Sequence, residues 1–337
     1  MSGASGSAEP VAAPEPEPVA QGGEVRVFEE LRPLLFSIAY RILGSVGEAE
    51  DAVQETWLRY ATAPNPPRSP KAFLSATVTR ISIDVLRSAR VRREQYVGDW
   101  LPEPLLADPY EDPERAAELA DSVSMAALLL LERLSPLERA VFVLREVFGF
   151  GFPEVAEAVD RSEAACRQLA VRARRHMAAG QARFEADREE RDELAARFFD
   201  ALRAGEVAGL RELLSADVQL VGDGGGKAPQ LSRTLVGAEP VARLLAAYVG
   251  RLSLVDASCE AREVNGGPGA VFRDRDSRVL FVWALDVVDG RIGTVRSITN
   301  PDKLGHLGPV GDGWRVAAEM QERQREERRR QRGSRTP

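Results

Sequence analysis

The sequence predicts a multidomain fold in which two all-α helical domains are followed by an α+β domain. In the first half of the chain, apolar residues recur three and four positions apart, as one face of a helix requires. A proline-rich stretch at residues 96–114 divides this half in two. After Glu189, short β-type runs separated by Gly, Asp and Asn follow two helical segments. The 337 residues suffice for two or three domains of about 100 to 150 residues each.

The composition and the N-terminus predict a cytoplasmic protein. Hydrophobic residues make up 44% of the chain and charged residues 29%, as is usual for globular proteins. Residues 1–23 hold glutamates and prolines where a signal peptide needs a basic start and an apolar stretch, so we expect a disordered lead. The longest apolar run, MAALLLL, is far shorter than a membrane span, and we expect no membrane contact.

Cysteine, histidine and charge usage limit the function classes further. Cys166 and Cys259 lie in different predicted domains, which argues against a disulfide framework, and with only two histidines we expect no metal site and no cofactor. The net charge is −7, yet residues 80–93 hold five arginines against one acid, and residues 167–176 hold four arginines against none. These basic segments suit nucleic-acid binding, and by charge alone they suit solvated helix faces equally well.

The first helical domain, residues 24–95, is predicted to contain three helices. Gly44 ends the first helix, and Ser45 with Glu48 forms a capping box for the second, which carries AEDAVQETWLRY. Ser69 and Pro70 have the chemistry to start the third. The expected buried positions of these helices are Phe28, Leu31, Leu35, Ile38 and Ile42, then Ala49, Val53, Trp57 and Tyr60, then Leu74, Val78, Ile81 and Val85.

The linker at residues 96–114 carries an unusual aromatic and apolar load, so we expect Trp100 and Leu101 to dock on another part of the chain. In the second helical domain, residues 115–185, a capping box at residues 135–138 opens a helix. The short helix FPEVAEAV, a tight turn and an arginine-rich helix capped by Ser162 then follow. This order predicts a helix-turn-helix motif.

The α+β domain is predicted at residues 189–310, with strands at Val218–Val221, Val279–Val287 and Arg291–Ile298. Residues 311–337 are predicted to form a charged tail, a frayed and solvated helix to which we assign no role.

The glycine-rich stretch VGDGGGKAPQ at residues 221–230 looks at first like a phosphate-binding loop. A Walker loop needs four residues between its first glycine and the Gly-Lys pair, then Ser or Thr, then a helix. Here only three residues separate Gly222 from Gly226, and Ala228 follows Lys227 where Ser or Thr is required. Pro229 is also unfavourable for such a helix. The glycines therefore indicate a contact loop at the end of a strand.

The two helical domains, with DAVQETWLR and DVLRSARVRRE in the first and the helix-turn-helix in the second, resemble region 2 and region 4 of a bacterial extracytoplasmic-function sigma factor. Further on, WLPEP at residues 100–104, DGGGK at residues 223–227 and NPDKL at residues 300–304 are similar to the three signature motifs of the subgroup with a fused SnoaL-like domain. The resemblance covers nearly the whole folded chain. It implies that the protein binds core RNA polymerase, through its β′ clamp and β flap, and promoter DNA.

The resemblance assigns roles to exposed residues of the two helical domains. The second helix is expected to grip the β′ clamp with Asp51, Gln54, Glu55 and Leu58. The third is expected to contact the minus-ten element with Arg80, Asp84, Arg87 and Arg90; many relatives have Asn where this chain has Arg80, and Asp84 could instead pair with Arg80 or Arg87. The recognition helix is expected to contact the minus-thirty-five element through Ser162, Glu163, Ala164, Arg167, Gln168, Arg172 and Arg175. Leu169 and Ala173 are expected in the core, and Cys166 is interpreted as a small packed residue.

The resemblance also implies that the C-terminal domain modulates the sigma factor in cis, without a separate anti-sigma protein. We expect its motifs to contact the linker or region 2, with Lys227 meeting an acid such as Glu103. The expected contact residues are Trp100, Leu101, Pro102, Asp223, Gly224, Gly225, Gly226, Lys227, Asn300, Pro301, Asp302, Lys303 and Leu304.

Two alternatives stay open at this point, and so does a small-molecule ligand in the C-terminal domain. A SnoaL-like enzyme fused to a DNA-binding regulator would need Asp223 or His306 to point into a ligand-sized cavity. A repressor or activator that uses its helix-turn-helix alone would bind closed duplex without polymerase.

Overall fold

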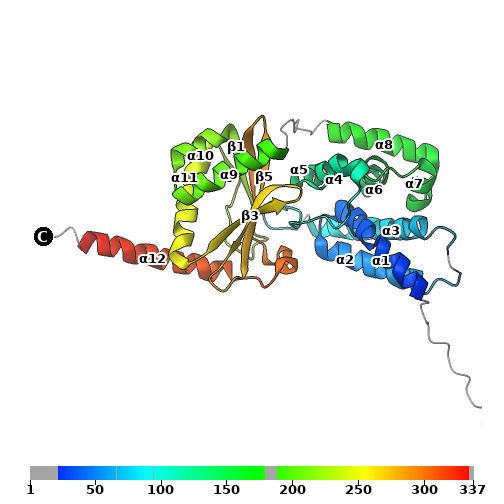
Figure 1. Cartoon of the computed structure of the whole chain (residues 1–337), viewed down its shortest axis with the longest axis horizontal. Coiled ribbons are helices and arrows are strands. Elements are labelled where there is room, and N and C mark those ends of the chain that lie inside the picture. The colour runs from blue at the N-terminus through cyan, green and yellow to red at the C-terminus, as the bar shows by residue number, and fades with distance from the viewer. Residues whose placement is uncertain (1–21, 66, 94, 179–187, 334–337) are drawn as a thin grey trace, which may run out of the picture.

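The computed structural model describes residues 22–65, 67–93, 95–178 and 188–333 (Figure 1). The side chains of residues 90–92, 115–118, 188, 332 and 333 lie outside this description, as does nearly all of the expected disordered lead. Gly22 and Gly23, the first described residues, already belong to a helix. The chain forms two all-α domains followed by an α+β domain, as the sequence predicts.

The first all-α domain consists of α1 (Gly22–Leu43), α2 (Val46–Ala61) and α3 (Pro70–Arg93). Gly44 ends α1 in the left-handed region, at φ +69°. Ser45 Oγ accepts a hydrogen bond from the Glu48 backbone N–H at 3.1 Å, which confirms the Ser45 half of the capping box predicted for α2. The predicted apolar positions are buried, except that Leu31, Trp57 and Val85 are only partly so.

The second all-α domain begins after the linker and contains the helix-turn-helix. Its capping box is complete, because the side chains of Ser135 and Glu138 each bond the other's backbone N–H. Asp160, left-handed at φ +52°, makes the tight turn, and Ser162 Oγ accepts from the Ala165 N–H at 3.3 Å. The elements are η1 (Pro113–Arg115), α4 (Ala116–Val123), α5 (Met125–Leu131), α6 (Pro136–Phe142), the π-helical turn η2 (Val143–Val147), α7 (Phe152–Val159) and α8 (Glu163–Ala178).

The C-terminal domain is a six-stranded sheet of order β2-β1-β6-β5-β4-β3 with helices on one face. The β1–β6 pair is parallel and the other pairs are antiparallel. The three predicted strands are confirmed as β1, β5 and β6, whereas β2, β3, β4 and α11 were not predicted. The elements are α9 (Arg188–Ala204), α10 (Val207–Leu213), β1 (Leu214–Asp223), β2 (Leu235–Val236), α11 (Ala238–Leu252), η3 (Ser253–Val255), β3 (Ser258–Val264), β4 (Gly267–Arg273), β5 (Val279–Val288), β6 (Arg291–Ile298), η4 (Pro301–Lys303), η5 (Gly305–Leu307) and α12 (Gly313–Gly333).

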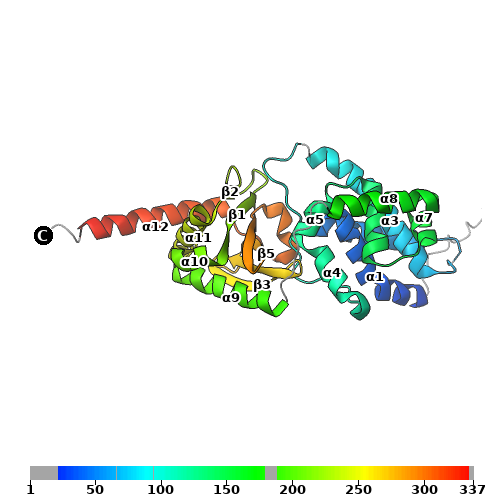
Figure 2. The ribbon, with the colours of Figure 1, turned by 90° about the horizontal axis from the view of Figure 1, so that it is seen from above.

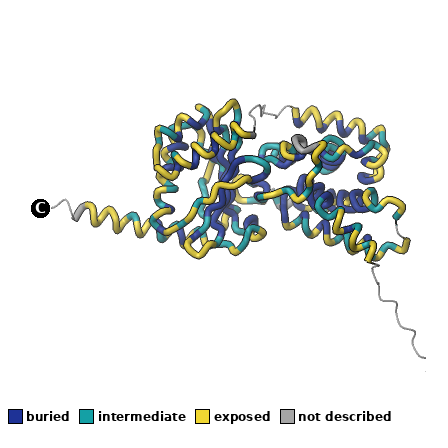
Figure 3. The backbone as a smooth tube through the Cα atoms, in the orientation of Figure 1, coloured by how far each residue is buried: buried dark blue, intermediate teal, exposed yellow. Residues whose placement is uncertain are grey.

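Both faces of the sheet are buried, each against a different part of the molecule (Figures 2 and 3). On β5, Phe281 and Trp283 point into the core that the sheet shares with α9, α10 and α11. The alternate residue Val282 points the other way, into a cluster with Leu101 of the linker and Met125 of α5. The helical half of the chain therefore completes the burial of the C-terminal sheet.

The C-terminal tail is helical as expected, but it is not solvated throughout. Val316 and Met320, in the first turns of α12, are each 5% exposed and belong to the core of the α+β domain. The rest of α12 projects away from the body of the molecule (Figure 1). Among the described residues, no helix combines the length and apolar character that crossing a membrane requires.

Candidate functional site

The predicted polymerase-binding residues lie on the outer face of α2. Asp51, Gln54 and Leu58 are exposed, and Leu58 leaves 56% of its surface to solvent. Glu55 is half-buried and pairs at 2.9 Å with the exposed Arg59 one helical turn away, and a pair this close to solvent contributes little to stability. The exposed Leu58 lies one helical turn from Gln54 and Glu55, so this face of α2 presents an apolar side chain beside polar ones.

The basic face of α3 meets the helix-turn-helix domain. The guanidinium of Arg80 donates to the backbone carbonyls of Glu157 at 2.6 Å and Ala158 at 3.1 Å, near the C-terminal end of α7. A cation is favoured there, because the last carbonyls of a helix lack partners within it. Asp84 pairs with Arg87 at 3.0 Å, which is one of the two pairings the sequence left open, and the side chain of Arg90 lies outside the description.

The recognition helix α8 presents its expected DNA-facing residues to solvent. All seven are exposed except Glu163, which is half-buried and pairs with Arg167 at 2.6 Å. Arg172 pairs with Glu138 of α6 at 3.0 Å. Leu169 and Ala173 are buried as predicted. Cys166 is fully buried, and burial raises the pKa of its thiol, in agreement with a packing role.

The glycine loop follows β1 directly and lies against the linker. Gly225 and Gly226 are left-handed, at φ +56° and +72°. A Cβ atom on Gly225 would lie 2.3 Å from the Asn300 amide nitrogen and 2.9 Å from the Tyr96 hydroxyl oxygen, so only glycine fits. Lys227 does not meet Glu103, which corrects that expectation: Lys227 Nζ lies 2.5 Å from Asp302 Oδ2 within the same domain.

A buried charge cluster joins this loop to the linker, and we call it the interdomain latch. It consists of Asp223, Lys303, Tyr96 and the backbone of Leu101. The Asp223 carboxylate accepts from the Tyr96 hydroxyl at 2.5 Å, from the Leu101 N–H at 2.8 Å and from Lys303 Nζ at 2.6 Å. Lys303 also donates to the Leu101 carbonyl, and Asn300 Nδ2 donates to the Tyr96 hydroxyl at 2.7 Å. The DGGGK, NPDKL and WLPEP motifs thus meet in one hydrogen-bonded cluster.

Asp223 and Lys303 form a buried ion pair in the latch. Asp223 is fully buried and Lys303 is 5% exposed. Burial lowers the pKa of Lys303 from its ordinary value, and the adjacent Asp223 carboxylate opposes that shift. Burial also raises the pKa of Tyr96, and its hydrogen bond to Asp223 adds to this effect. The tyrosine therefore remains a proton donor at neutral pH.

Trp100 connects the latch to both helical domains. Lys303 Nζ lies 4.4 Å from the centre of its ring and the guanidinium carbon of Arg93 lies 3.8 Å from it, both cation–π contacts. Arg93 pairs with Glu132, which also pairs with Arg139. Burial alone would raise the pKa of Glu132, but the two arginines hold it below its ordinary value.

The rest of the WLPEP motif caps helix α2. Glu103 accepts from the Ser45 hydroxyl and the Val46 N–H at 2.7 Å each, so the linker supplies a carboxylate to the N-terminus of the helix that carries the predicted polymerase face. His306 Nε2 lies 2.7 Å from the Pro104 carbonyl oxygen. Pro102 and Leu304 are buried at the same junction.

A second interdomain contact, which the sequence did not predict, is the β3–β4 turn. Asn265, at φ +53° and 2% exposed, donates through Nδ2 to the Tyr40 hydroxyl at 2.6 Å and to the Val123 carbonyl at 3.0 Å. Its Oδ1 accepts from the Leu105 N–H at 2.9 Å, and its own N–H donates to the Leu105 carbonyl at 2.7 Å. One residue thereby joins both helical domains and the linker. The Asn-Gly pair at 265–266 is a hairpin-turn signal that could have located it.

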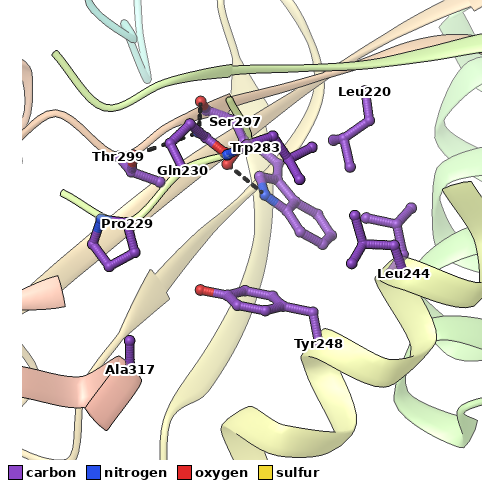
Figure 4. A pocket seen from close by; sticks show the side chains of 11 residues that line it. Leu220, Pro229, Gln230, Leu244, Tyr248, Trp283, Ser297, Thr299 and Ala317 are labelled. Carbon is purple, nitrogen blue, oxygen red and sulfur yellow. Dashed lines mark hydrogen bonds between the residues drawn. The ribbon is translucent and has the colours of Figure 1, made fainter. Parts of the chain in front are cut away.

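The C-terminal domain also contains an apolar cavity between its sheet, α11 and α12 (Figure 4). An enzyme of the kind considered above would direct Asp223 or His306 into it. Within the described part of the chain, neither residue lines this cavity. Asp223 is in the latch and His306 contacts the linker.

Comparison with known proteins identifies the domains. Sigma-70 region 2 matches residues 27–92, and Sigma-70, region 4 matches residues 124–177. The ECF RNA polymerase sigma factor SigJ of Mycobacterium tuberculosis is 40% identical over 294 residues, which cover 83% of this chain and 93% of that protein. A "Probable ECF RNA polymerase sigma factor SigI" from the same species is 30% identical over 279 residues, or 82% of this chain and 93% of that one.

Comparison with solved structures finds the same relative. The crystal structure of M. tuberculosis SigJ superposes with a TM-score of 0.65 at 36% identity and covers 83% of this chain and 98% of that chain. Sigma factors are not enzymes, and regions 2 and 4 imply core RNA polymerase and promoter DNA as partners. The chain belongs to the extracytoplasmic-function RNA polymerase sigma factors, in the group that carries a fused SnoaL-like C-terminal domain.

Proposed function

We propose that the C-terminal domain controls this sigma factor in cis by holding the linker in its docked position, and that the docked molecule is the resting state. The observation that carries the proposal is the interdomain latch, in which the buried Asp223 carboxylate accepts the Leu101 N–H and the Tyr96 hydroxyl. Each of these hydrogen bonds to a charged group contributes about 1.5 to 3 kcal/mol. No separate anti-sigma protein is needed for this control.

The position of Arg80 supports the assignment of the docked form as resting. Arg80, which we propose contacts the minus-ten element together with Asp84, Arg87 and Arg90, here donates to carbonyls of α7. By their names, the minus-ten and minus-thirty-five elements lie about 25 base pairs apart, or about 85 Å at about 3.4 Å per pair. With α3 packed against α7, the two DNA-binding faces cannot span that distance, so initiation requires the domains to separate.

The remaining roles follow from exposure. We propose that Asp51, Gln54, Glu55 and Leu58 bind the β′ clamp, that region 4 reaches the β flap, and that the exposed residues of α8 bind the minus-thirty-five element. The C-terminal domain acts without catalysis, because its candidate acid and base serve interdomain contacts. The protein works in the cytoplasm, with polymerase and the chromosome.

A reversible disulfide between the linker and the glycine loop tests the proposal in the full chain. A Cβ atom on Gly226 would lie 3.5 Å from the Val97 Cβ, which is within the range of disulfides. We expect the oxidised double variant Val97→Cys/Gly226→Cys to fail in open-complex formation with core polymerase, and the reduced protein to regain it. Native Cys166 is fully buried and Cys259 is half-buried, so the two new thiols should pair.

The single variants Val97→Cys and Gly226→Cys are the matched controls and should be indifferent to oxidation. If the oxidised double variant initiated transcription as well as its reduced form, the docked molecule would not be the resting state. Val97 is 65% exposed, so its substitution should not alter folding.

A further inference from the structure

The apolar cavity of the C-terminal domain has the size and lining of a small-molecule site. Its volume is about 220 Å³, and its apolar lining includes Leu220, Leu244, Leu245 and Trp283. Well-packed interiors leave few voids larger than a water molecule. Because an apolar cavity of about 150 Å³ holds benzene, 220 Å³ suits about nine or ten non-hydrogen atoms.

One polar group points into this space without a partner. The Tyr248 hydroxyl is directed between Pro229 and Ala317 (Figure 4), and it makes no hydrogen bond to any residue that the structure describes. Tyr248 is half-buried, so its hydroxyl is free to bond a molecule that enters the cavity. Burial raises the pKa of Tyr248 to about 12, so the hydroxyl stays protonated and can donate to a ligand oxygen. By contrast, Trp283 Nε1 already donates to Ser297 Oγ at 3.1 Å.

The rim of the cavity can admit a molecule. Pro229, Tyr248 and Ala317 are only half-buried, and they belong to the loop after the glycine motif, to α11 and to α12. Helix α12 is tied to the same loop, because Trp314 Nε1 donates to the Lys227 carbonyl at 3.0 Å. The loop and α12 therefore border the cavity together.

We propose that this cavity binds a small, mainly apolar organic molecule of about nine or ten non-hydrogen atoms, with a single oxygen that accepts the hydrogen bond of Tyr248. An aromatic ketone meets these requirements. The leucines and Trp283 receive its apolar part, and α12 covers it.

The cavity adjoins the interdomain latch through Thr299. Its hydroxyl and its backbone N–H donate to the Asp223 carbonyl at 3.1 and 2.8 Å, and Thr299 also lines the cavity. Gln230 Nε2 donates to the Ser297 carbonyl at 3.0 Å, so the cavity wall holds the loop that follows Asp223. A ligand is therefore expected to alter docking of the linker, and this consequence, unlike binding itself, rests on the proposed function.

Calorimetric titration of the full chain with acetophenone, which has nine non-hydrogen atoms, tests the site. Ethylbenzene, which lacks the oxygen, is the matched probe. We expect acetophenone to bind more tightly than ethylbenzene, and Tyr248→Phe to weaken acetophenone binding about three- to tenfold while leaving ethylbenzene unchanged. Ala317→Phe should fill the cavity and abolish binding of both probes, whereas Ala318→Phe, on the exposed face of the same helix, should not.

Absence of acetophenone binding to the unsubstituted chain at millimolar concentration would overturn the proposal. So would equal binding to Ala317→Phe with an unchanged thermal midpoint, or the same affinity for the two probes. Hydrogen exchange at the Leu101 amide, measured with and without acetophenone, separates ligand binding from its effect on docking of the linker. Binding without any change in that exchange leaves the site established and removes only its link to the latch.

Discussion

Replacement of Tyr96 by Phe removes a single hydroxyl from the linker and should loosen the docked state. The hydroxyl donates to the Asp223 carboxylate at 2.5 Å and accepts from Asn300 Nδ2 at 2.7 Å. Tyr96 lies outside both the sigma domains and the sheet, and the ring stays in place in the variant. The substitution therefore acts on docking rather than on the folding of either half.

The size of the effect follows from the charge on Asp223. A hydrogen bond to a charged group contributes about 1.5 to 3 kcal/mol, and each 1.4 kcal/mol changes an equilibrium about tenfold. The ratio of docked to undocked molecules should thus fall by about ten- to one-hundredfold. Water can reach Asp223 after undocking, so the upper part of this range is an upper bound.

Hydrogen exchange reports this ratio directly, because the Leu101 N–H is bonded to Asp223 only when the linker is docked. We expect the Leu101 amide of Tyr96→Phe to exchange about ten- to one-hundredfold faster than in the unsubstituted chain. Tyr248→Phe makes the same chemical change away from the linker and should leave this amide unaffected. Unchanged exchange in Tyr96→Phe would refute the role given to the latch.

Three other outcomes are expected. Leu58→Asp should weaken binding to core polymerase by more than about tenfold. The thermal midpoint should not change, because Leu58 is 56% exposed. Unaltered affinity would show that α2 is not part of the polymerase interface. Arg175→Ala should weaken binding to all duplexes and reduce the slope of log K against log salt by about 0.9, as expected for one phosphate contact; an unchanged slope would place Arg175 off the DNA. Burial raises the pKa of Cys259 to about 11 from an ordinary value of 9.0, so the folded state disfavours the thiolate. The free energy of unfolding of the unsubstituted chain, relative to that of Cys259→Ala, should therefore fall as pH rises from 9.0 to about 11. Parallel unfolding profiles of the two proteins over that range would contradict this.

Local patterns predicted six helices of the helical half, although α4 and α5 were not predicted individually. Capping at Ser45, Ser135 and Ser162 depends on a few neighbouring residues, and the structure has each of these caps. The three predicted strands were likewise runs of adjacent β-type residues. Strand β3 was missed because five of its seven side chains are exposed, so its sequence SCEAREV has no apolar alternation to detect.

Partners across domains could not be predicted from local patterns. Lys227 and Lys303 are both lysines near acids in the sequence, and only the fold decides that Lys303 is buried against Asp223 while Lys227 stays exposed beside Asp302. Arg80 was expected to be free for DNA, but its contact with α7 depends on how two domains pack. Asn265 makes four hydrogen bonds, to Tyr40, Val123 and Leu105. These partners lie between 142 and 225 positions away, so no local stretch of sequence contains them.

The two kinds of contact at the domain junction contribute differently to docking. When the linker leaves, water can replace the hydrogen bonds to Asp223, so the latch adds less net free energy than its number of bonds indicates. Leu101 and Val282, by contrast, would expose apolar surface that water cannot compensate. The apolar cluster should therefore supply most of the affinity. The latch fixes which position of the linker is accepted, because any other docked position would leave the buried Asp223 carboxylate without the Tyr96 and Leu101 donors. The release of the linker that we propose is helped by this division, since a small displacement of Asp223 would remove the specificity without unfolding the sheet.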